Sequence, residues 1–202
     1  MRHLEITTYI GCPNMCSYCP QKLLISSYKG EKRMSVETLR KILDNVPTDV
    51  DIHYSGFSEL FFHPQAVELL KETFKTHRVV VYTTTKGMTD EVYEQIKDMP
   101  FKEFHVHDRG ARDIPFKTDS VVINKSNAIS RGGNLWETKS EGTHCKKSPS
   151  YEQNVVLPNG DVVLCCMDYG LKHKLGNLLE QSFNDLKREN NYDLCKSCEW
   201  YV

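Results

Sequence analysis

Alternating polar and apolar positions define the first element of the chain. Across residues 3–10, Leu4, Ile6 and Ile10 fall on one face, whereas Glu5 and Thr7 fall on the other. A period of two residues is typical of a β-strand that buries one face. We therefore predict a strand over residues 3–10, directly before a cysteine-rich loop.

A helical period comes next and then alternates with further strand patterns. Ser35 is a suitable N-cap, and the apolar residues behind it recur at helical spacing until Pro47 ends the run. Residues 21–33 show no clear period and are predicted as a loop. The remaining pattern predicts strands over residues 51–55, 78–83, 101–107 and 120–124, and helices over residues 64–76 and 89–97.

This order of elements predicts an α/β fold, because strands that alternate with helices favour parallel βαβ units. Five strands before residue 125 are too few for a closed eight-stranded barrel. We therefore expect a partial, open β/α barrel of about five to six parallel strands, with a sixth strand between residues 128 and 141. The cysteine-rich loop then lies at the carboxyl end of the first strand, where barrel enzymes carry their chemistry.

The pattern changes after the glycine-containing residues 126–142. Two strand-like runs, residues 153–157 and 161–165, are joined by Asn159-Gly160, which is a strong hairpin signal. An amphipathic stretch over residues 178–186 predicts a helix. We expect two domains, with the barrel over residues 1–140 and a small subdomain of a β-hairpin plus a helix over residues 141–202.

The composition of the chain does not favour nucleic acid or membranes as binding partners. The 202 residues include 26 Lys and Arg against 27 Asp and Glu, for a net charge of −1, so no basic field favours nucleic acid or an anionic membrane. No run approaches the roughly 20 apolar residues of a membrane helix, and no export signal is present. We expect a soluble, cytoplasmic protein without nucleic-acid or membrane partners, whose eight cysteines are reduced.

Candidate chemistry begins with Cys12, Cys16 and Cys19, which follow the first predicted strand at spacings of three and two intervening residues. Three thiolates on one short loop can hold three corners of an iron-sulfur cube, and the fourth iron is then open to an exogenous ligand. A structural zinc site or a ferredoxin-like carrier is the alternative. Zinc sites usually use C-x2-C pairs, and ferredoxin runs use other spacings, so neither fits well.

This spacing, with Tyr18 directly before the third cysteine, resembles the signature of the radical SAM superfamily. The resemblance implies that Cys12, Cys16 and Cys19 hold a [4Fe-4S] cluster, and that its open iron binds S-adenosylmethionine. It also implies reductive cleavage of that cofactor to a 5′-deoxyadenosyl radical, with the electron coming from an external flavodoxin- or ferredoxin-like donor. Tyr18 would lie against the adenine.

Five later cysteines form a second group, and their spacing alone does not choose between zinc and a second cluster. The order of Cys145, the Asn159-Gly160 hairpin with Cys165, then a closing C-x2-C pair resembles the SPASM/twitch extension of radical SAM enzymes. The resemblance implies an auxiliary [4Fe-4S] cluster, making two clusters in all, with Cys145, Cys165, Cys195 and Cys198 as ligands. Cys166 is then spare, since neighbouring residues of a strand point to opposite faces.

Residues 56–59 follow the second predicted strand and resemble, in a looser G-x-x-E form, the superfamily's glycine-glycine-glutamate motif. In that family the backbone here receives the methionine ammonium of the cofactor, and glycine permits close approach. The resemblance also places a cofactor contact on the fourth strand. The expected cofactor-binding residues are Tyr18, Gly56, Phe57, Ser58, Glu59, Thr84 and His105.

No catalytic residue is identified by the sequence. His105, His107 and Asp108 are weak candidates at the end of the fourth predicted strand, and a single histidine is more often surface or packing than catalytic. Other side chains that could line the rim of a pocket are His53, Arg109 and Arg131, and Thr83, Thr84 and Thr85 could contact cofactor or substrate.

The expected activity is hydrogen abstraction from a substrate, followed by electron transfer to the auxiliary cluster, which is a net oxidation. The resemblance implies that peptide-modifying members often carry a separate leader-binding domain, whereas here the first predicted strand begins within five residues of Met1, so we expect a small molecule such as a sugar or cyclitol. A peptide substrate with oxidation, crosslinking or epimerisation is the alternative. A non-catalytic iron-sulfur or zinc protein is the alternative from another class, and a glycyl-radical-activating member would leave the later cysteines unexplained.

Overall fold

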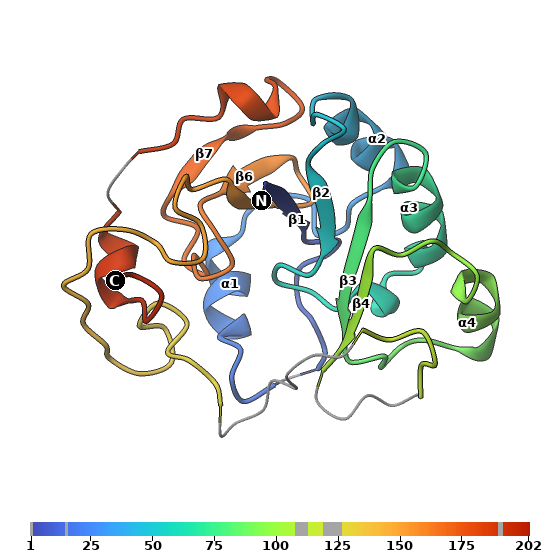
Figure 1. The fold of residues 1–202 in the computed structure, drawn as a ribbon, viewed down its shortest axis with the longest axis horizontal. Helices are drawn as coiled ribbons and strands as arrows, with labels where there is room; N and C mark the ends of the chain where they lie inside the picture. The colour runs from blue at the N-terminus through green and yellow to red at the C-terminus, as the bar shows by residue number, and fades with distance from the viewer. Residues whose placement is uncertain (1, 15, 108–112, 119–126, 190–191) are drawn as a thin grey trace.

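The computed structural model describes residues 2–14, 16–107, 113–118, 127–189 and 192–202. The described residues form a seven-stranded sheet in the order β4-β3-β2-β1-β5-β6-β7 (Figure 1). Its strands are β1 (His3–Ile6), β2 (Asp51–Tyr54), β3 (Val79–Thr83), β4 (Glu103–Val106), β5 (Gln153–Val156), β6 (Asp161–Val163) and β7 (Lys174–Asn177). In this order, the strands from β4 through β3, β2 and β1 to β5 all run parallel to one another. Strand β6 is antiparallel to β5, and β7 is antiparallel to β6. The predicted α/β class with an open, mostly parallel sheet is therefore confirmed.

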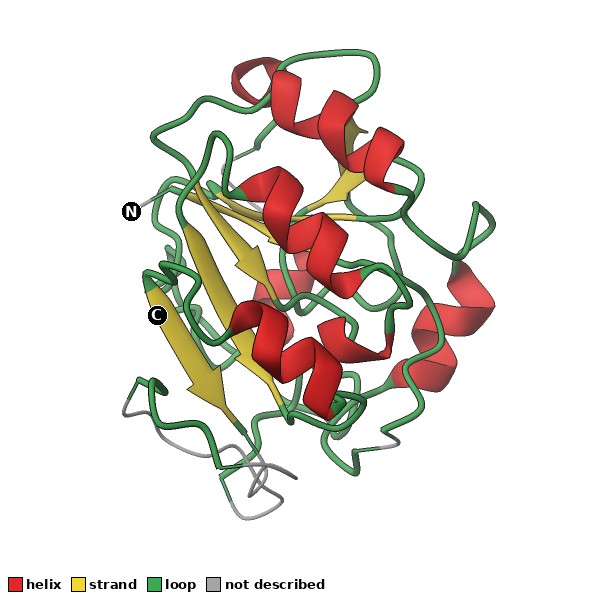
Figure 2. Ribbon diagram, turned by 90° about the vertical axis from the view of Figure 1, so that its right-hand side faces the viewer, coloured by secondary structure: helices red, strands yellow, loops and turns green. Residues whose placement is uncertain are grey.

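Three helices cover one face of the sheet, which we call the outer face (Figure 2). They are α2 (Val36–Asp44), α3 (Ala66–Thr73) and α4 (Asp90–Ile96). The Ser35 hydroxyl caps α2 by accepting from the Thr38 amide at 3.0 Å, a contact worth about 1 kcal/mol. Leu4, Ile52 and Phe104 face these helices and belong to the main core. The alternation seen in the sequence thus separates a helix-covered face from a second, inner face.

A fourth helix lies on the inner face and corrects the prediction of a loop at residues 21–33. Helix α1 (Gln21–Ser27) buries Gln21 and Leu24, and Tyr28 follows one turn later. One buried residue per turn makes a stripe too narrow for hydrophobic periodicity to reveal. The helix packs into a second hydrophobic cluster with Phe57, Val155, Val163 and Tyr169.

The carboxyl-terminal part differs from the prediction in its elements. Residues 178–186 form no α-helix; the segment holds a short 3-10 helix at Phe183–Asp185, and β7 precedes it. The ladder between β6 and β7 fixes residues 174–177, and the Phe183 amide donates to the Asn45 carbonyl at 2.8 Å, so tertiary contacts override the local period. No strand forms within residues 128–141, and the predicted strand at 120–124 lies outside the described residues.

The sheet crosses the predicted domain boundary. Strand β5 pairs in parallel with β1, with His3 opposite Gln153 and Ile6 opposite Val156, so it supplies the fifth parallel strand. Strands β5 and β6 are joined by the turn at Asn159-Gly160, where Gly160 adopts a φ of +84°. The division at residue 140 stays a prediction. None of the described helices is long and apolar enough to cross a membrane.

Candidate active site and metal centres

Three of the predicted metal ligands lie on one loop between β1 and α1. Cys12, Cys16 and Cys19 are half-buried, and the Cys19 amide donates to the Cys16 carbonyl at 3.1 Å, which turns the loop on itself. The loop follows β1 at the carboxyl end of the parallel strands, as predicted. Burial raises the pKa of the Cys12 thiol, and iron would stabilise the thiolate.

Buried polar groups surround this loop. The Asn14 amide donates to the Thr84 hydroxyl at 3.0 Å, and the Gln21 amide donates to the Phe57 carbonyl at 2.6 Å. The side-chain oxygens of Asn14 and Gln21 have no partner among the described residues. Two unpartnered acceptors beside three thiols fit a bound group that donates hydrogen bonds, as the predicted cofactor would.

The predicted cofactor-binding segment 56–59 is anchored to β1. The Glu5 carboxylate accepts from the Gly56 amide and the Ser55 hydroxyl, both at 2.9 Å, and the Thr7 hydroxyl accepts from the Phe57 amide at 3.2 Å. A Cβ on Gly56 would stand 2.6 Å from the Thr7 hydroxyl, and φ at Gly56 is +58°, so only glycine fits. These bonds fix the backbone expected to face the cofactor.

Ser58 and Glu59 bind protein rather than facing open space. The Ser58 hydroxyl accepts from the Thr8 amide at 3.1 Å. The Glu59 carboxylate accepts from the Thr83 hydroxyl at 2.5 Å and from the Thr84 amide and hydroxyl at 2.6 and 2.8 Å. Burial raises the pKa of Glu59, and these bonds oppose the rise. Glu59 and Thr84 therefore join the ends of β2 and β3, and direct contact with a cofactor stays a prediction.

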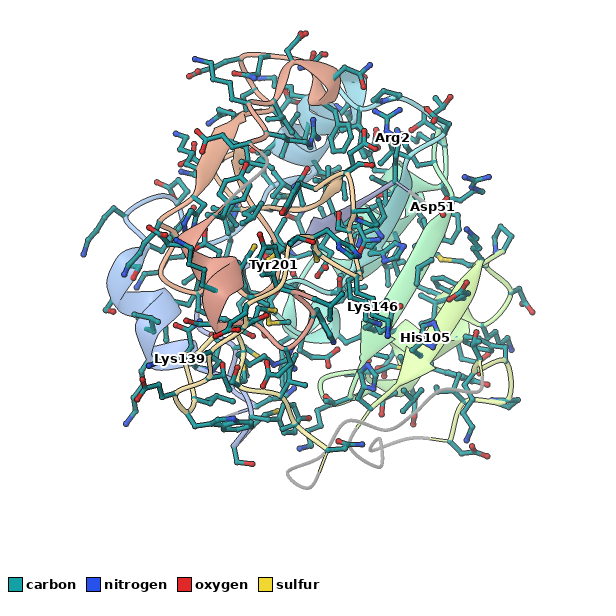
Figure 3. The ribbon with its side chains drawn as sticks, turned by 60° about the vertical axis from the view of Figure 1, so that its left-hand side comes forward. Arg2, Asp51, His105, Lys139, Lys146 and Tyr201 are labelled. Atoms are coloured by element: carbon teal, nitrogen blue, oxygen red, sulfur yellow. The ribbon has the colours of Figure 1, made fainter. Side chains whose placement is uncertain are left out.

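Imidazole and phenol rings line the inner face across four strands. His3 stacks on His53 with ring centroids 4.0 Å apart, and Tyr82 stacks on His105 at 4.5 Å and on His107 at 5.6 Å. Figure 3 shows His105 on β4, with Tyr201 of the carboxyl-terminal segment to its left in the view. The structure thus brings together the predicted residues His53, His105 and His107.

Two of these histidines, His53 and His107, have lowered pKa values. Burial and the neighbouring His3 lower the pKa of His53 to about 3, and burial, His105 and Arg131 lower that of His107 to about 4. His105 Nε2 lies 2.7 Å from the Glu103 carboxylate, and its buried Nδ1 has no partner within the described part of the chain. The candidates Asp108 and Arg109 lie outside the described residues.

The other four predicted ligands come together around one pocket. Cys145, Cys165, Cys195 and Cys198 all line it, beside Tyr151 and Trp200. Two backbone hydrogen bonds bring Cys145 to the carboxyl terminus. The Lys146 amide donates to the Trp200 carbonyl at 2.7 Å, and the Val202 amide donates to the His144 carbonyl at 3.0 Å. A turn bond from the Cys198 amide to the Cys195 carbonyl at 3.0 Å joins the last two.

The thiols of this pocket interact through space. Burial and the neighbouring Cys145 and Cys198 raise the pKa of Cys195 to about 11, and burial, then Cys166 and Cys198 among others, raises that of Cys165 well above its usual value. Among the described residues, no three His, Cys, Asp or Glu side chains could hold one metal ion together. The ligands of a cube bind separate irons, so four thiols spaced around a pocket fit a cluster.

Cys166 also lines the pocket, which corrects the argument that excluded it. Strand β6 ends at Val163, so Cys165 and Cys166 both lie in the following turn, and strand alternation does not apply to them. Their neighbours differ nonetheless. The two thiols interact with each other, but Cys165 also interacts with Cys198, whereas Cys166 interacts with Glu5 and Arg131, so Cys166 stays the predicted spare thiol.

Arg131 lies between the two groups of cysteines. Its Nε donates to the Tyr18 carbonyl at 3.3 Å, and its guanidinium interacts with Tyr169, Cys166 and Cys19. Tyr18 is half-buried. The sequence analysis missed Tyr82 and Tyr169, and it gave Glu5 no role at the site. Glu5 alternates to the polar face of β1 and could have been recognised, whereas no local pattern marks Tyr169.

Comparisons with known proteins agree with this arrangement. Residues 145–199 match the model of SPASM, an iron-sulfur cluster-binding domain. Among solved structures, the chain is similar to BtrN in complex with AdoMet and 2-DOIA, covering 96% of this chain and 83% of that one, and to selenomethionine BtrN in an open conformation, covering 98% and 92%.

Both alignments have a TM-score of 0.68 at 20% identity, so they establish the fold. A search of the curated proteins found no significant match. Residues 145–199 therefore resemble a SPASM iron-sulfur cluster-binding domain, as predicted, and the chain shares its fold with BtrN.

Proposed function

We propose that this chain is a radical SAM enzyme that oxidises a small hydroxylated molecule, such as a sugar or cyclitol. One observation carries the proposal. Cys145, Cys165, Cys195 and Cys198 gather around one pocket on the sheet whose first strand leads into the loop with Cys12, Cys16 and Cys19. The likeness to BtrN, which was crystallised with AdoMet and 2-DOIA, supports it.

The two cysteine groups would hold two [4Fe-4S] clusters. When bound, the first cluster and S-adenosylmethionine would supply a 5′-deoxyadenosyl radical for hydrogen abstraction, and the second would supply an electron acceptor. The chain itself holds the cofactor-facing backbone through Glu5 and Thr7 and keeps the cysteine loop against Thr84. An external flavodoxin- or ferredoxin-like donor would deliver the first electron.

The inner face supports an uncharged, hydroxyl-bearing substrate. His53 and His107 are neutral at pH 7, because their pKa values are lowered to about 3 and about 4. Neutral imidazoles both donate and accept hydrogen bonds, as hydroxyl groups do. Among the described residues, charged groups of both signs interact with them: Glu5, Asp51 and Lys102 with His53, and Arg131 with His107. A strongly anionic or cationic substrate would find little net charge to pair with.

Anaerobic reconstitution tests the proposal. We expect about eight irons and eight sulfides per chain and release of 5′-deoxyadenosine when dithionite and S-adenosylmethionine are added. Deuterium from a carbon-deuterated polyol should appear in the 5′-deoxyadenosine, measured by mass spectrometry. Cys16→Ala is the matched control and should release none. A chain that holds zinc alone, or two clusters without adenosine product, would contradict the proposal.

A further inference from the structure

A tyrosine of the carboxyl-terminal domain reaches the amino-terminal cysteine loop. The Tyr169 hydroxyl lies 3.4 Å from Cys19 Sγ, although 150 residues separate the two in the chain. Tyr169 is 3% exposed and sits in the turn after β6, within the SPASM match. Figure 1 shows the segment that follows β6, in orange, beside α1, and Tyr169 packs there against Phe57 with ring centroids 4.7 Å apart. The contact is therefore held by packing.

The direction of this hydrogen bond follows from the role proposed for Cys19. A thiolate bound to iron has no proton and can only accept, so the tyrosine hydroxyl donates. The Gln21 side-chain amide is the other nearby donor, but it lies farther from the same sulfur, at 3.5 Å, and one of its two N–H groups donates to the Phe57 carbonyl at 2.6 Å. Tyr169 is thus the donor best placed to act on this sulfur.

We infer that Tyr169 is a positioning residue that donates a hydrogen bond to the Cys19 thiolate and raises the reduction potential of the first cluster. Hydrogen bonds to cluster sulfurs stabilise the additional negative charge of the reduced state, and this sets the potential together with charge and burial. Arg131, whose guanidinium interacts with Cys19, adds a positive charge on the same side. The auxiliary domain would then tune the site that reduces the cofactor; the inference rests on the proposed function.

Tyr169→Phe in the reconstituted full chain tests this inference, with Tyr28→Phe as the matched control. Tyr28 lies in the same hydrophobic cluster, but its hydroxyl donates to the Glu31 carbonyl at 2.7 Å. Redox titration followed by electron paramagnetic resonance should show a more negative potential for the first cluster in Tyr169→Phe and an unchanged one in Tyr28→Phe. The first cluster is recognised as the one whose signal changes when S-adenosylmethionine is added.

Two further readouts keep the test decisive. In D2O, the wild-type reduced first cluster should show an exchangeable deuteron coupling by pulsed electron paramagnetic resonance that Tyr169→Phe lacks. If Tyr169→Phe fails to hold the cluster, 3-fluorotyrosine at position 169, a stronger donor of the same shape, should shift the potential positively. An unchanged potential in a variant that retains its iron overturns the inference. Absence of the first cluster from the wild type would instead contradict the proposed function.

Discussion

The two cysteine sites are built in opposite ways. Cys12, Cys16 and Cys19 belong to one loop, so eight residues of sequence bring all three thiols together. The carboxyl-terminal pocket draws Cys145, Cys165 and the final C-x2-C pair from three separate segments. The first site depends on local spacing, whereas the second exists only once β5, β6 and the chain terminus have assembled.

The two sites also differ in their relation to the core. Cys195 and Cys198 are 8% and 7% exposed and belong to the main hydrophobic core, whereas the cysteines of the amino-terminal loop are half-buried. A substitution in the amino-terminal loop can therefore abolish activity and leave the fold intact. A substitution of Cys195 or Cys198 should lower both activity and stability.

The largest expected effect is on activity at the first site. Cys16→Ala removes a corner ligand, so release of 5′-deoxyadenosine should fall at least about 1000-fold, because the chemistry belongs to the bound cofactor. In the chain without clusters, the free energy of unfolding should change by less than about 1 kcal/mol, since the side chain is not part of the core. Product assay and denaturant unfolding measure the two quantities. Undiminished turnover would show that this loop does not hold the reactive cluster.

The second effect is on stability at the second site. Cys198→Ala deletes a core side chain, and it should lower the free energy of unfolding of the chain without clusters by about 1–2 kcal/mol. Urea unfolding under anaerobic conditions measures this loss, with Cys16→Ala as the control. If both variants lose the same stability, the proposed contrast between the sites is wrong.

A third comparison lies within the pocket itself. Cys165→Ala should reduce the iron content from about eight to about four per chain, whereas Cys166→Ala should leave it at about eight. The two thiols are adjacent in sequence and both line the pocket, so each variant controls for the other. Loss of four irons from Cys166→Ala would transfer the ligand role to that residue.

The smallest expected effect is on the pH dependence of stability, and it comes from the histidines of the inner face, which belong to neither cysteine site. The pKa of His53 is lowered to about 3, so below the ordinary value of about 6.5 the unfolded chain binds a proton that the folded chain does not. The contribution of His53 is complete above pH 6.5 and should fall by about 1 kcal/mol between pH 7.5 and 5.5, and His107, whose pKa is lowered to about 4, should lose a similar amount.

His53→Gln should reduce this slope by about half, measured as the dependence of the unfolding midpoint on pH, because His107 still contributes, and Cys166→Ala should retain it. An equal slope in His53→Gln and the wild type would mean that another group titrates.

Much of the outer half of the fold could be predicted. The Ser35 cap, the period of α2 and the alternation along β1 each depend on neighbours in sequence, and all three appear in the structure. Helix α1 escaped prediction because it buries a narrow stripe. Residues 178–186 were predicted wrongly because β7 directly before them pairs with β6 and the Phe183 amide donates to the Asn45 carbonyl, and these contacts override the helical period.

Local sequence alone brought the three thiols of the amino-terminal loop together, because they lie within eight residues of one another. It also marked the strand and helix faces, since periodicity reports which side is buried. Tertiary structure decided the rest. Three features join residues that are far apart in sequence, and only the assembled sheet brings these residues together. They are the stacking of Tyr82 on His105, the placement of Arg131 between the cysteine groups and the contact of Tyr169 with Cys19.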